Sequence, residues 1–380
     1  MSFRRQVRSP RVLAGAVPAL ILAATAAPAA VPAATHARPS AAGAWRIVTV
    51  IGGKDVYLDD LAAVSASDIW LGGSRGSTTT VPVLYRLSNG RLKATTEPKS
   101  QYAFVSDLSV QPGHAGNVWA AEDETPYVLH LGKHGWRRYA LRVGSDDVSV
   151  AGVVPLSGTS TWAFVNDVSK DSAYFFHFNG AAWRRQPAPS LFGSNDSIGL
   201  VSGTAGSNIW ALSPLKPTGA PGALHYNGTR WVTTDLPAAL TPTDHLWALN
   251  VSAQAPGSAW VTMFATTRTA AGPVVLAHWN HGRWNRITGK LPAADLQGPI
   301  ASDGHGGLWL YATTPNGRTG LFLHYTHGRW TSYRVPTAGH QPITVNGLTL
   351  VPGSDKVLAV GPLAASDDGD AGSVVLEYTP

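Results

Sequence analysis

The sequence predicts an all-β protein built from one repeated unit, and two regular series of tryptophans carry that prediction. Twelve of the fourteen Trp residues fall on these series. Members of the first lie 43 to 50 residues apart: Trp70, Trp119, Trp162, Trp210, Trp260 and Trp309. The second comprises Trp45, Trp136, Trp183, Trp231, Trp284 and Trp330, with Leu92 at the one position without Trp. A period in the forties is typical of propellers and of arrays of small sheets.

Each repeat reads as four short strands, A to D. Strand B is apolar-Trp-small, as in Ile69-Trp70-Leu71. After a variable loop, strand C reads aliphatic-His-aromatic, and a tight turn joins it to the Trp of strand D, as in segment 224–231. The pairs Asn179-Gly180 and Asn227-Gly228 predict hairpins with type I′ turns, which need positive φ at both central residues. No segment shows the helical periodicity that βαβ units require.

The repeat count and the chain ends together predict a closed ring. Six strand B segments contain Trp, and segment 357–360 supplies a seventh without it. The seventh repeat stops at strand C, 375–378, whereas segment 44–48 is a strand D with no repeat of its own. We expect this N-terminal strand to complete the last blade of a seven-bladed β-propeller, because closure protects strand edges. An open solenoid would instead need polar capping repeats.

This repeat pattern covers residues 45–380 and resembles the repeats of secreted, actinobacterial-type seven-bladed β-propellers. Segment 303–309, Asp-Gly-His-Gly-Gly-Leu-Trp, also resembles repeats of two-component-regulator propellers and of streptogramin lyase-like propellers. The resemblance implies the fold. It implies no particular activity, because one fold supports many functions.

The N-terminal region is predicted to lie outside the propeller. We expect a secretory signal peptide over 1–37, a short linker over 38–44 and a single propeller domain over 45–380, because a basic head precedes an Ala-rich apolar stretch. An uncleaved anchor is the alternative, and Pro18, Pro28 and Pro32 argue against a stable membrane span. The chain has no Cys, so it forms no disulfide. We therefore expect a secreted, extracellular or cell-envelope protein, and a monomer.

The net charge gives no support for nucleic-acid binding. The formal charge of the whole chain is +6, and segment 1–37 contributes four Arg and no acidic residue, which leaves +2 for the rest. Binding to a phosphate backbone depends on clustered positive charge. We therefore expect a protein or glycan ligand and no nucleic acid.

The candidate ligand-binding residues precede or begin the innermost strands. The D-to-A and B-to-C connections are predicted to share one face and to vary most between repeats, and such loops on a rigid scaffold often bind ligands. The candidates are Asp60, Asp107, Asp147, Asp196, Asp244, His245 and Trp247. Trp247 lies outside the two series, next to a predicted loop, and is a candidate for ligand stacking. The alternative is that each Asp shapes its own turn by bonding backbone N–H groups.

Other polar clusters have structural interpretations. Five strand C histidines share one repeat position, His130, His177, His225, His278 and His324, with Tyr85 and Glu377 expected there in the other two repeats. Equivalent positions in a ring lie too far apart to share one metal ion, so we expect structural histidines. Segments 122–124 and 367–370 offer oxygen donors suited to calcium, although solvated loop charge is the favoured interpretation. We predict no other cofactor.

No catalytic signature accompanies the repeat. Gly-x-Ser-x-Gly and His-Glu-x-x-His are absent from the sequence. The favoured function is a secreted, non-enzymatic binding module with its ligand on the variable-loop face. The alternatives are an extracellular lyase or glycan-processing hydrolase that uses His and Asp at the same place, and a purely structural envelope protein.

Overall fold

Seven antiparallel sheets of four strands form the described part of the chain in a computed structural model. Described are residues 43–52, 55–76, 79–95, 103–111, 114–145, 147–170, 172–187, 198–204, 208–213, 222–237, 245–266, 271–287, 295–363 and 372–380. The side chains of 213, 245–247, 265–266, 271–273 and 295–297 lie outside this description. The predicted signal peptide also falls outside it.

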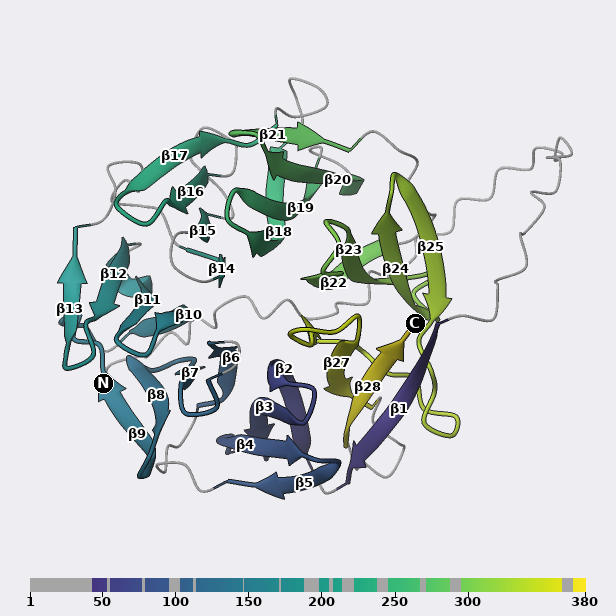
Figure 1. Cartoon of the computed structure of the whole chain (residues 1–380), viewed down its shortest axis with the longest axis horizontal. Coiled ribbons are helices and arrows are strands. Elements are labelled where there is room, and N and C mark those ends of the chain that lie inside the picture. The colour runs from purple at the N-terminus through teal and green to yellow at the C-terminus, as the bar shows by residue number, and fades with distance from the viewer. Residues whose placement is uncertain are drawn as a thin grey trace, which may run out of the picture. The chain divides into compact units, whose positions relative to one another are not determined.

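Each of the first six blades uses four consecutive strands, in the order A to D from the ring axis outward (Figure 1). Blades 1 to 3 contain β2 (Val56–Ser65), β3 (Asp68–Arg75), β4 (Val81–Ser88), β5 (Arg91–Ala94), β6 (Val105–Val110), β7 (Val118–Glu122), β8 (Tyr127–Gly132), β9 (Gly135–Ala140), β10 (Val148–Ser157), β11 (Ser160–Asp167), β12 (Ser172–Phe178) and β13 (Trp183–Gln186). A short 3-10 helix, η1 (Val168–Lys170), lies between β11 and β12.

The other blades repeat the arrangement. Blades 4 to 6 contain β14 (Leu200–Thr204), β15 (Asn208–Ser213), β16 (Gly222–Tyr226), β17 (Trp231–Asp235), β18 (His245–Ala255), β19 (Ser258–Thr266), β20 (Ala271–Asn280), β21 (Arg283–Arg286), β22 (Asp295–Ser302), β23 (Leu308–Thr313), β24 (Gly320–Thr326) and β25 (Arg329–Arg334). Blade 7 contains β26 (Gly347–Leu350), β27 (Val357–Pro362), β28 (Ser373–Thr379) and β1 (Ala44–Ile51).

The ring closes as predicted, with the N-terminal strand in blade 7. β1 pairs antiparallel with β28, from Ala44 opposite Thr379 to Ile51 opposite Ser373. The innermost strands contact one another in the cyclic order β2, β6, β10, β14, β18, β22, β26 and back to β2. Because every blade therefore has a neighbour on both sides, no blade face is left uncovered. The sequence prediction of a seven-bladed β-propeller with four-stranded antiparallel blades is confirmed.

The tryptophans fill the spaces between blades. The strand B Trp of one blade meets the strand D Trp of the next: Trp70 and Trp136 lie edge-to-face at 5.4 Å, and Trp119 and Trp183 at 5.3 Å. Trp309 meets Trp45 of the closing strand in the same way, at 5.5 Å. Such aromatic pairs bury about 150–250 Å² per side chain, so they contribute much of the inter-blade packing. All members of the first series are buried with Trp45 and Trp284, whereas Trp136, Trp183, Trp231 and Trp330 are half-buried at the outer edge of this packing.

One interface replaces both tryptophans at once. Leu358 takes the strand B position in blade 7, and Leu92 takes the strand D position in blade 1. Both belong to the apolar cluster between these two blades. The two positions at which the series lack Trp therefore face each other across one interface, between blades 7 and 1.

Two turns differ from the prediction. Gly180 and Gly228 have positive φ, at 87° and 93°, but Asn179 and Asn227 do not. In each turn the Asn side-chain oxygen accepts backbone N–H groups, from Ala181 and Ala182 in the first case. These are four-residue turns shaped by the Asn side chain, not type I′ turns. Positive φ at two successive residues occurs instead at Asn89-Gly90, with 48° and 75°, and also at His281-Gly282 and His327-Gly328.

Candidate functional site

Asp60 and Asp107 occupy the same repeat position on neighbouring innermost strands. Asp60 pairs with Gly72, and Asp107 with Ala121, two residues after the strand B Trp in both blades. A register shift directly precedes each Asp. Such a bulge re-aims the side chain that follows it. Both residues therefore lie within β2 and β6, and not in the loops that lead into these strands.

Each of these carboxylates bonds the next blade. Asp60 Oδ2 accepts the Leu108 N–H of β6 at 2.8 Å, and Asp107 Oδ2 accepts the Val153 N–H of β10 at 2.7 Å. Asp60 Oδ1 also accepts the N–H of Leu61. The alternative to ligand binding was that each Asp bonds backbone N–H groups, and both residues do so. These hydrogen bonds join adjacent blades as well as shaping the local strand.

Burial dominates the electrostatics of the pair. Both residues are half-buried, and the surrounding blades desolvate the carboxyl groups, which disfavours their charged form. The pKa of Asp107 is raised to about 7 by this desolvation, against the opposing hydrogen bond from Val153. The pKa of Asp60 is raised well above its usual value by burial and by the nearby charge of Asp107. The hydrogen bonds that the two carboxylates accept from backbone N–H groups lower both pKa values, but by less than burial raises them.

The position is not acidic around the whole ring. Gly152, Leu200, Asn250 and Gly347 pair with the equivalent strand B residue in four other blades. Asn250 also bonds its neighbour, because its side-chain amide donates to the Gly298 carbonyl oxygen at 2.7 Å. In the described residues, the pair Asp60 and Asp107 is thus a local feature of blades 1 and 2.

Asp147 lies elsewhere, on the face that carries the D-to-A and B-to-C connections. It is exposed and stands directly before β10. Its backbone carbonyl oxygen accepts the N–H of Val168, and its own N–H donates to Ser145. Nearby, Asp167 accepts hydrogen bonds from Ser169 and from Lys170. These contacts fix the shape of two neighbouring connections around an exposed carboxylate.

The remaining candidates are only partly placed. Asp196 and Asp244 lie outside the described residues. His245 and Trp247 lie in β18, opposite Thr266 and Phe264, but their side chains lie outside the description. Trp279, the other Trp outside the two series, packs at 5.1 Å from Trp210 and is part of an inter-blade cluster.

The candidate calcium segment 122–124 is engaged in protein contacts. Glu122 is fully buried at the end of β7 and forms an ion pair with Arg138 at 2.9 Å. Asp123 accepts a hydrogen bond from the Ser149 hydroxyl. Segment 367–370 lies outside the described residues. Among the residues that the structure does describe, no three His, Cys, Asp or Glu side chains group as a metal site.

The strand C histidines lie against the tryptophans of strand B. His130, His225, His278 and His324 stack on Trp119, Trp210, Trp260 and Trp309 with centroids 4.0 to 4.3 Å apart. Three of these four rings also bond a side chain near the A-to-B turn, such as Asn208 for His225. Burial lowers the pKa of His130 to about 4. Burial also lowers the pKa of His225 and His278, and His324 pairs with Asp303 at 3.0 Å, so all four have structural roles.

For blade 1, the residue predicted to occupy this position was wrong by one place in the sequence. Arg86, not Tyr85, pairs with Trp70. Its guanidinium lies 5.4 Å from the Trp70 ring and makes two hydrogen bonds to Asp68, at 2.7 and 2.9 Å. The apolar-polar alternation of strand C would have placed Arg86 correctly, because Leu84 and Arg86 share one face.

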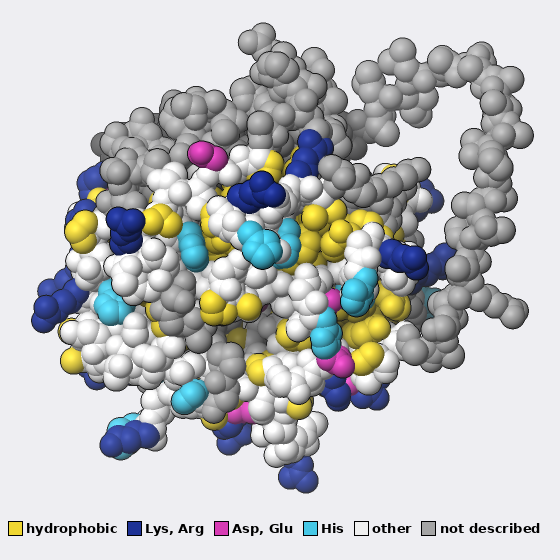
Figure 2. All heavy atoms as spheres, turned by 45° about the horizontal axis from the view of Figure 1, so that its top comes forward, with side chains coloured by type: hydrophobic (Ala, Val, Ile, Leu, Met, Phe, Trp, Pro, Cys, Tyr) yellow, Lys and Arg dark blue, Asp and Glu magenta, His cyan; other side chains and the backbone are white. Residues whose placement is uncertain are grey.

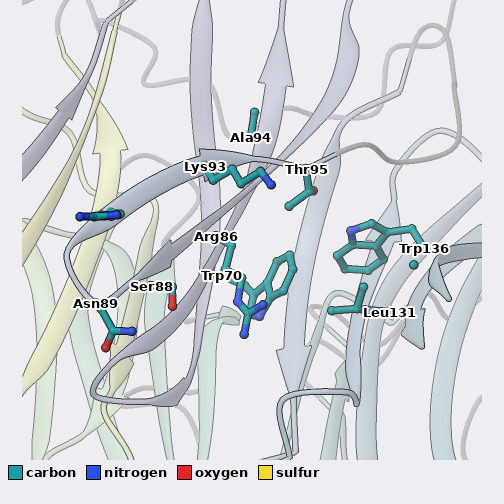
Figure 3. A pocket seen from close by; sticks show the side chains of 11 residues that line it. Trp70, Arg86, Ser88, Asn89, Lys93, Ala94, Thr95, Leu131 and Trp136 are labelled. Carbon is teal, nitrogen blue, oxygen red and sulfur yellow. The ribbon is translucent and has the colours of Figure 1, made fainter. Parts of the chain in front are cut away.

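A groove of about 820 Å³ opens beside Arg86, between blades 1 and 2. Its lining includes Trp70, Arg86, Arg91 and Lys93 of blade 1 and Leu131 and Trp136 of blade 2. Figure 3 shows Trp70 and Arg86 facing Leu131 and Trp136, with Lys93 and Thr95 above them. The sequence analysis did not identify this site. Its signal was a departure from the repeat, because Arg86 stands where strand C carries His in five other blades.

Lys and Arg form no continuous stripe on the face that Figure 2 shows. They stand singly or in small groups around it, with fewer Asp and Glu between them. In the described part of the chain, no helix has the length and hydropathy needed to cross a membrane.

Comparisons with known proteins agree on the fold alone. No family model matches the chain, and no curated protein matches its sequence. A solved structure of YCF48 bound to D1 peptide is similar, with a TM-score of 0.57, 13% identity, and coverage of 90% of this chain and 99% of that one. YCF48 from Cyanidioschyzon merolae has a TM-score of 0.56, 14% identity, and coverage of 89% and 99%. The WD40 propeller domain of Doa1 has a TM-score of 0.53, 9% identity, and coverage of 87% and 96%.

Proposed function

We propose that the protein is a secreted, non-enzymatic interaction module that binds a protein or glycan partner on its variable-loop face. The observation that carries this proposal is the inequality of the two faces. On one, the D-to-A connections range from 52–55 to 187–199, and the B-to-C connections from 123–126 to 363–372. On the other, the A-to-B turns range from 66–67 to 111–117 and the C-to-D turns only from 89–90 to 179–182, so the longest connections lie on the first face. Length variation on a rigid scaffold is typical of a recognition surface.

Two further observations support a protein partner. Asp147 is exposed, and hydrogen bonds within the two connections beside it fix their described residues. Preordered groups lose less conformational entropy on binding. A protein of similar fold, YCF48, has been solved with a D1 peptide bound, so this architecture is able to hold a peptide.

Secretion rests on the composition of the N-terminal segment. A basic head followed by an Ala-rich stretch is the pattern of a signal peptide. The test is to express the full chain in a secreting host and to determine the N-terminus of the protein in the medium. Secretion predicts a new N-terminus near residue 38, whereas an intact N-terminus in the cell fraction contradicts it.

The binding face is tested with a displayed peptide library and a glycan array. The tightest ligand is then titrated against Asp147→Lys, which reverses an exposed charge on the loop face. The matched control is Lys133→Glu, a charge reversal in a C-to-D turn on the opposite face. We expect Asp147→Lys to weaken binding by about 3- to 30-fold, since rim charges contribute modestly. If Asp147→Lys bound the ligand as tightly as the parent protein and only Lys133→Glu bound it more weakly, the ligand would bind the opposite face and the proposal would be contradicted.

The raised pKa of Asp107 is the one observation that favours the enzyme alternative. A carboxyl with a pKa near 7 suits general acid–base catalysis at neutral pH. Its hydrogen bond to Val153 gives it a structural role, but Asp107→Asn separates the two interpretations. An enzyme using Asp107 loses about 10²–10⁴-fold in turnover. An interaction module keeps its affinity for the selected ligand.

A further inference from the structure

The groove between blades 1 and 2 opens at the C-to-D turns and extends along β5 to Thr95, the first residue of the next D-to-A connection. It is bounded by the C-to-D turns of both blades, with Asn89 from one and Gly135 from the other. A ligand here would occupy a second site, separate from the proposed partner surface. A volume of about 820 Å³ falls within the range of small-molecule sites, about 300–1,000 Å³.

One departure from the repeat shapes this space. In four other blades a His ring lies flat on the strand B Trp, within 4.3 Å. In blade 1, Asp68 draws the Arg86 guanidinium away, so that it lies 5.4 Å from the Trp70 centroid. Blade 2 contributes Leu131 and Trp136 to the opposite wall, and Gly135 borders the groove with its backbone alone.

The charge of the groove has one sign. Arg86 and Lys93 stand opposite each other on β4 and β5, as do Ser88 and Arg91, so all four side chains share one face of blade 1. Arg91 and Lys93 are exposed. Neither forms an ion pair within the described residues, and no acidic residue lines the groove. Asp68 fixes Arg86 by two bonds, which holds one planar donor in place at the wall.

The other lining groups are neutral or apolar. Ser88 and Thr95 supply hydroxyls and Asn89 an amide, all of which both donate and accept hydrogen bonds. Trp136 is half-buried and, with Leu131, supplies an apolar wall. The hydroxyl and amide groups suit the hydroxyls of a sugar, and the Trp136 indole suits its ring. Arg91 and Lys93, which form no ion pair within the described residues, suit its acidic groups. An acidic peptide matches less well, because an added strand would bind the edge of β5, whereas these side chains project from the face of the sheet.

We propose that this groove binds an acidic saccharide, with its carboxylates paired to Arg91 and Lys93 and a sugar ring against Trp136. Arg86 donates to the ligand from a fixed position, and Ser88, Asn89 and Thr95 bond its hydroxyls. This site is separate from the surface around Asp147, because Thr95 is the only residue lining the groove that belongs to a variable connection.

The test is calorimetric titration of the mature protein at low salt with three probes. These are an oligosaccharide of glucuronic acid, the glucose oligosaccharide with the same linkages, and a polyglutamate peptide of equal charge. We expect the glucuronic acid oligomer to bind and the glucose oligomer to bind at least about tenfold more weakly, because hydrogen bonds to charged groups contribute most. Binding should also weaken as salt screens the charges.

Variants then locate the site. Arg91→Glu combined with Lys93→Glu should weaken binding of the glucuronic acid oligomer at least about tenfold, whereas Lys93→Arg should retain it. Arg137→Glu is the control. Arg137 is exposed and occupies the position in blade 2 that Lys93 occupies in blade 1, where it stands opposite His130. Its side chain therefore lies on the face of blade 2 that turns away from the groove. Near-ultraviolet circular dichroism confirms that each variant is folded.

Four results would overturn the assignment. They are no binding of the glucuronic acid oligomer, equal binding of the glucose oligomer, tighter binding of polyglutamate, or equal losses in Arg137→Glu and in the groove variant. None of them affects the variable-loop proposal, which the Asp147→Lys comparison tests on the other face.

Discussion

The carboxylates of Asp60 and Asp107 each join two blades through a backbone amide of the neighbouring strand. Such a bond satisfies an amide on an innermost strand, which has no further strand on its axial side. Its cost is that a carboxyl group is desolvated. Burial raises the pKa of both groups, so their ionised forms are destabilised in the folded protein relative to the unfolded chain.

The raised pKa of Asp107 predicts how stability depends on pH. Its folded pKa is about 7 and the value expected for the unfolded chain is 3.8. Between these values the folded state binds the extra proton, so the free energy of unfolding falls as pH rises from about 4 to 7. Asp107→Asn keeps an oxygen for the Val153 N–H and removes the titration. We expect the variant to be more stable than the parent at pH 7.5, by about 1–3 kcal/mol.

Urea unfolding of both proteins at pH 4.5, 6 and 7.5 checks this. The difference in stability should grow with pH and nearly vanish at the acid end. Asp147→Asn is the control, because Asp147 is exposed and bonds no neighbouring blade through its carboxylate in the described structure. A constant difference at all three pH values would show that Asp107 is ionised in the folded protein throughout.

Residue-level predictability depended on whether a side chain follows the repeat. The Trp and His positions were predictable, because a residue that recurs at one place in most repeats has one packing environment. The site residues were not. Asp60 and Asp147 both precede apolar segments in the sequence, yet one lies at a bulge inside β2 and the other in a connection. A bulge adds one residue to a strand, and no local pattern in the sequence marks it.

At the level of elements, β1 is the part of the fold that closes the ring. Its Trp45 stacks on Phe322 at 3.7 Å and packs edge-to-face with Trp309, so the strand bonds blade 7 and also covers blade 6. Its Arg46 forms an ion pair with Glu377 of β28 at 2.8 Å. The strand was predictable from the mismatch between an incomplete last repeat and an unassigned first strand. Its register was not, because a shift between Ile47 and Thr49 interrupts the pairing.

Removal of β1 should open this closure. We compare a chain that begins at residue 52 with one that begins at Gly43, which keeps the whole strand. The shorter chain lacks Trp45, and the loss of its contacts alone costs about 3–5 kcal/mol of stability. It also exposes the edge of β28, so we expect a lower melting temperature and aggregation. A synthetic peptide of residues 43–52 should restore part of the stability. Equal melting temperatures for the two chains would contradict the closing role of β1.

On the scale of the whole molecule, the fold was predictable and the recognition surface was not. Seven blades follow from a periodic pattern, since each blade repeats one packing problem with one solution. The connections carry no such repetition, and two of the candidate residues within them, Asp196 and Asp244, lie outside the described structure. The groove between blades 1 and 2 lies between Arg86, a departure from the repeat in blade 1, and Trp136 of blade 2, 50 residues later. Only the folded ring brings them together.

The ring also predicts which pairs of substitutions interact. Trp119 and Trp183 share the interface of blades 2 and 3, whereas Trp284 lies between blades 4 and 5. We expect Trp119→Leu and Trp183→Leu to be non-additive, with a coupling of about 0.5–1.5 kcal/mol from the lost edge-to-face contact. Trp119→Leu and Trp284→Leu should add within about 0.5 kcal/mol, because they share no partner. Urea unfolding of the single and double variants gives both values. Since Leu358 and Leu92 already replace both tryptophans at one interface, each interface is expected to pack as a local unit. A coupling between the distant pair as large as that of the adjacent pair would show instead that strain spreads around the ring.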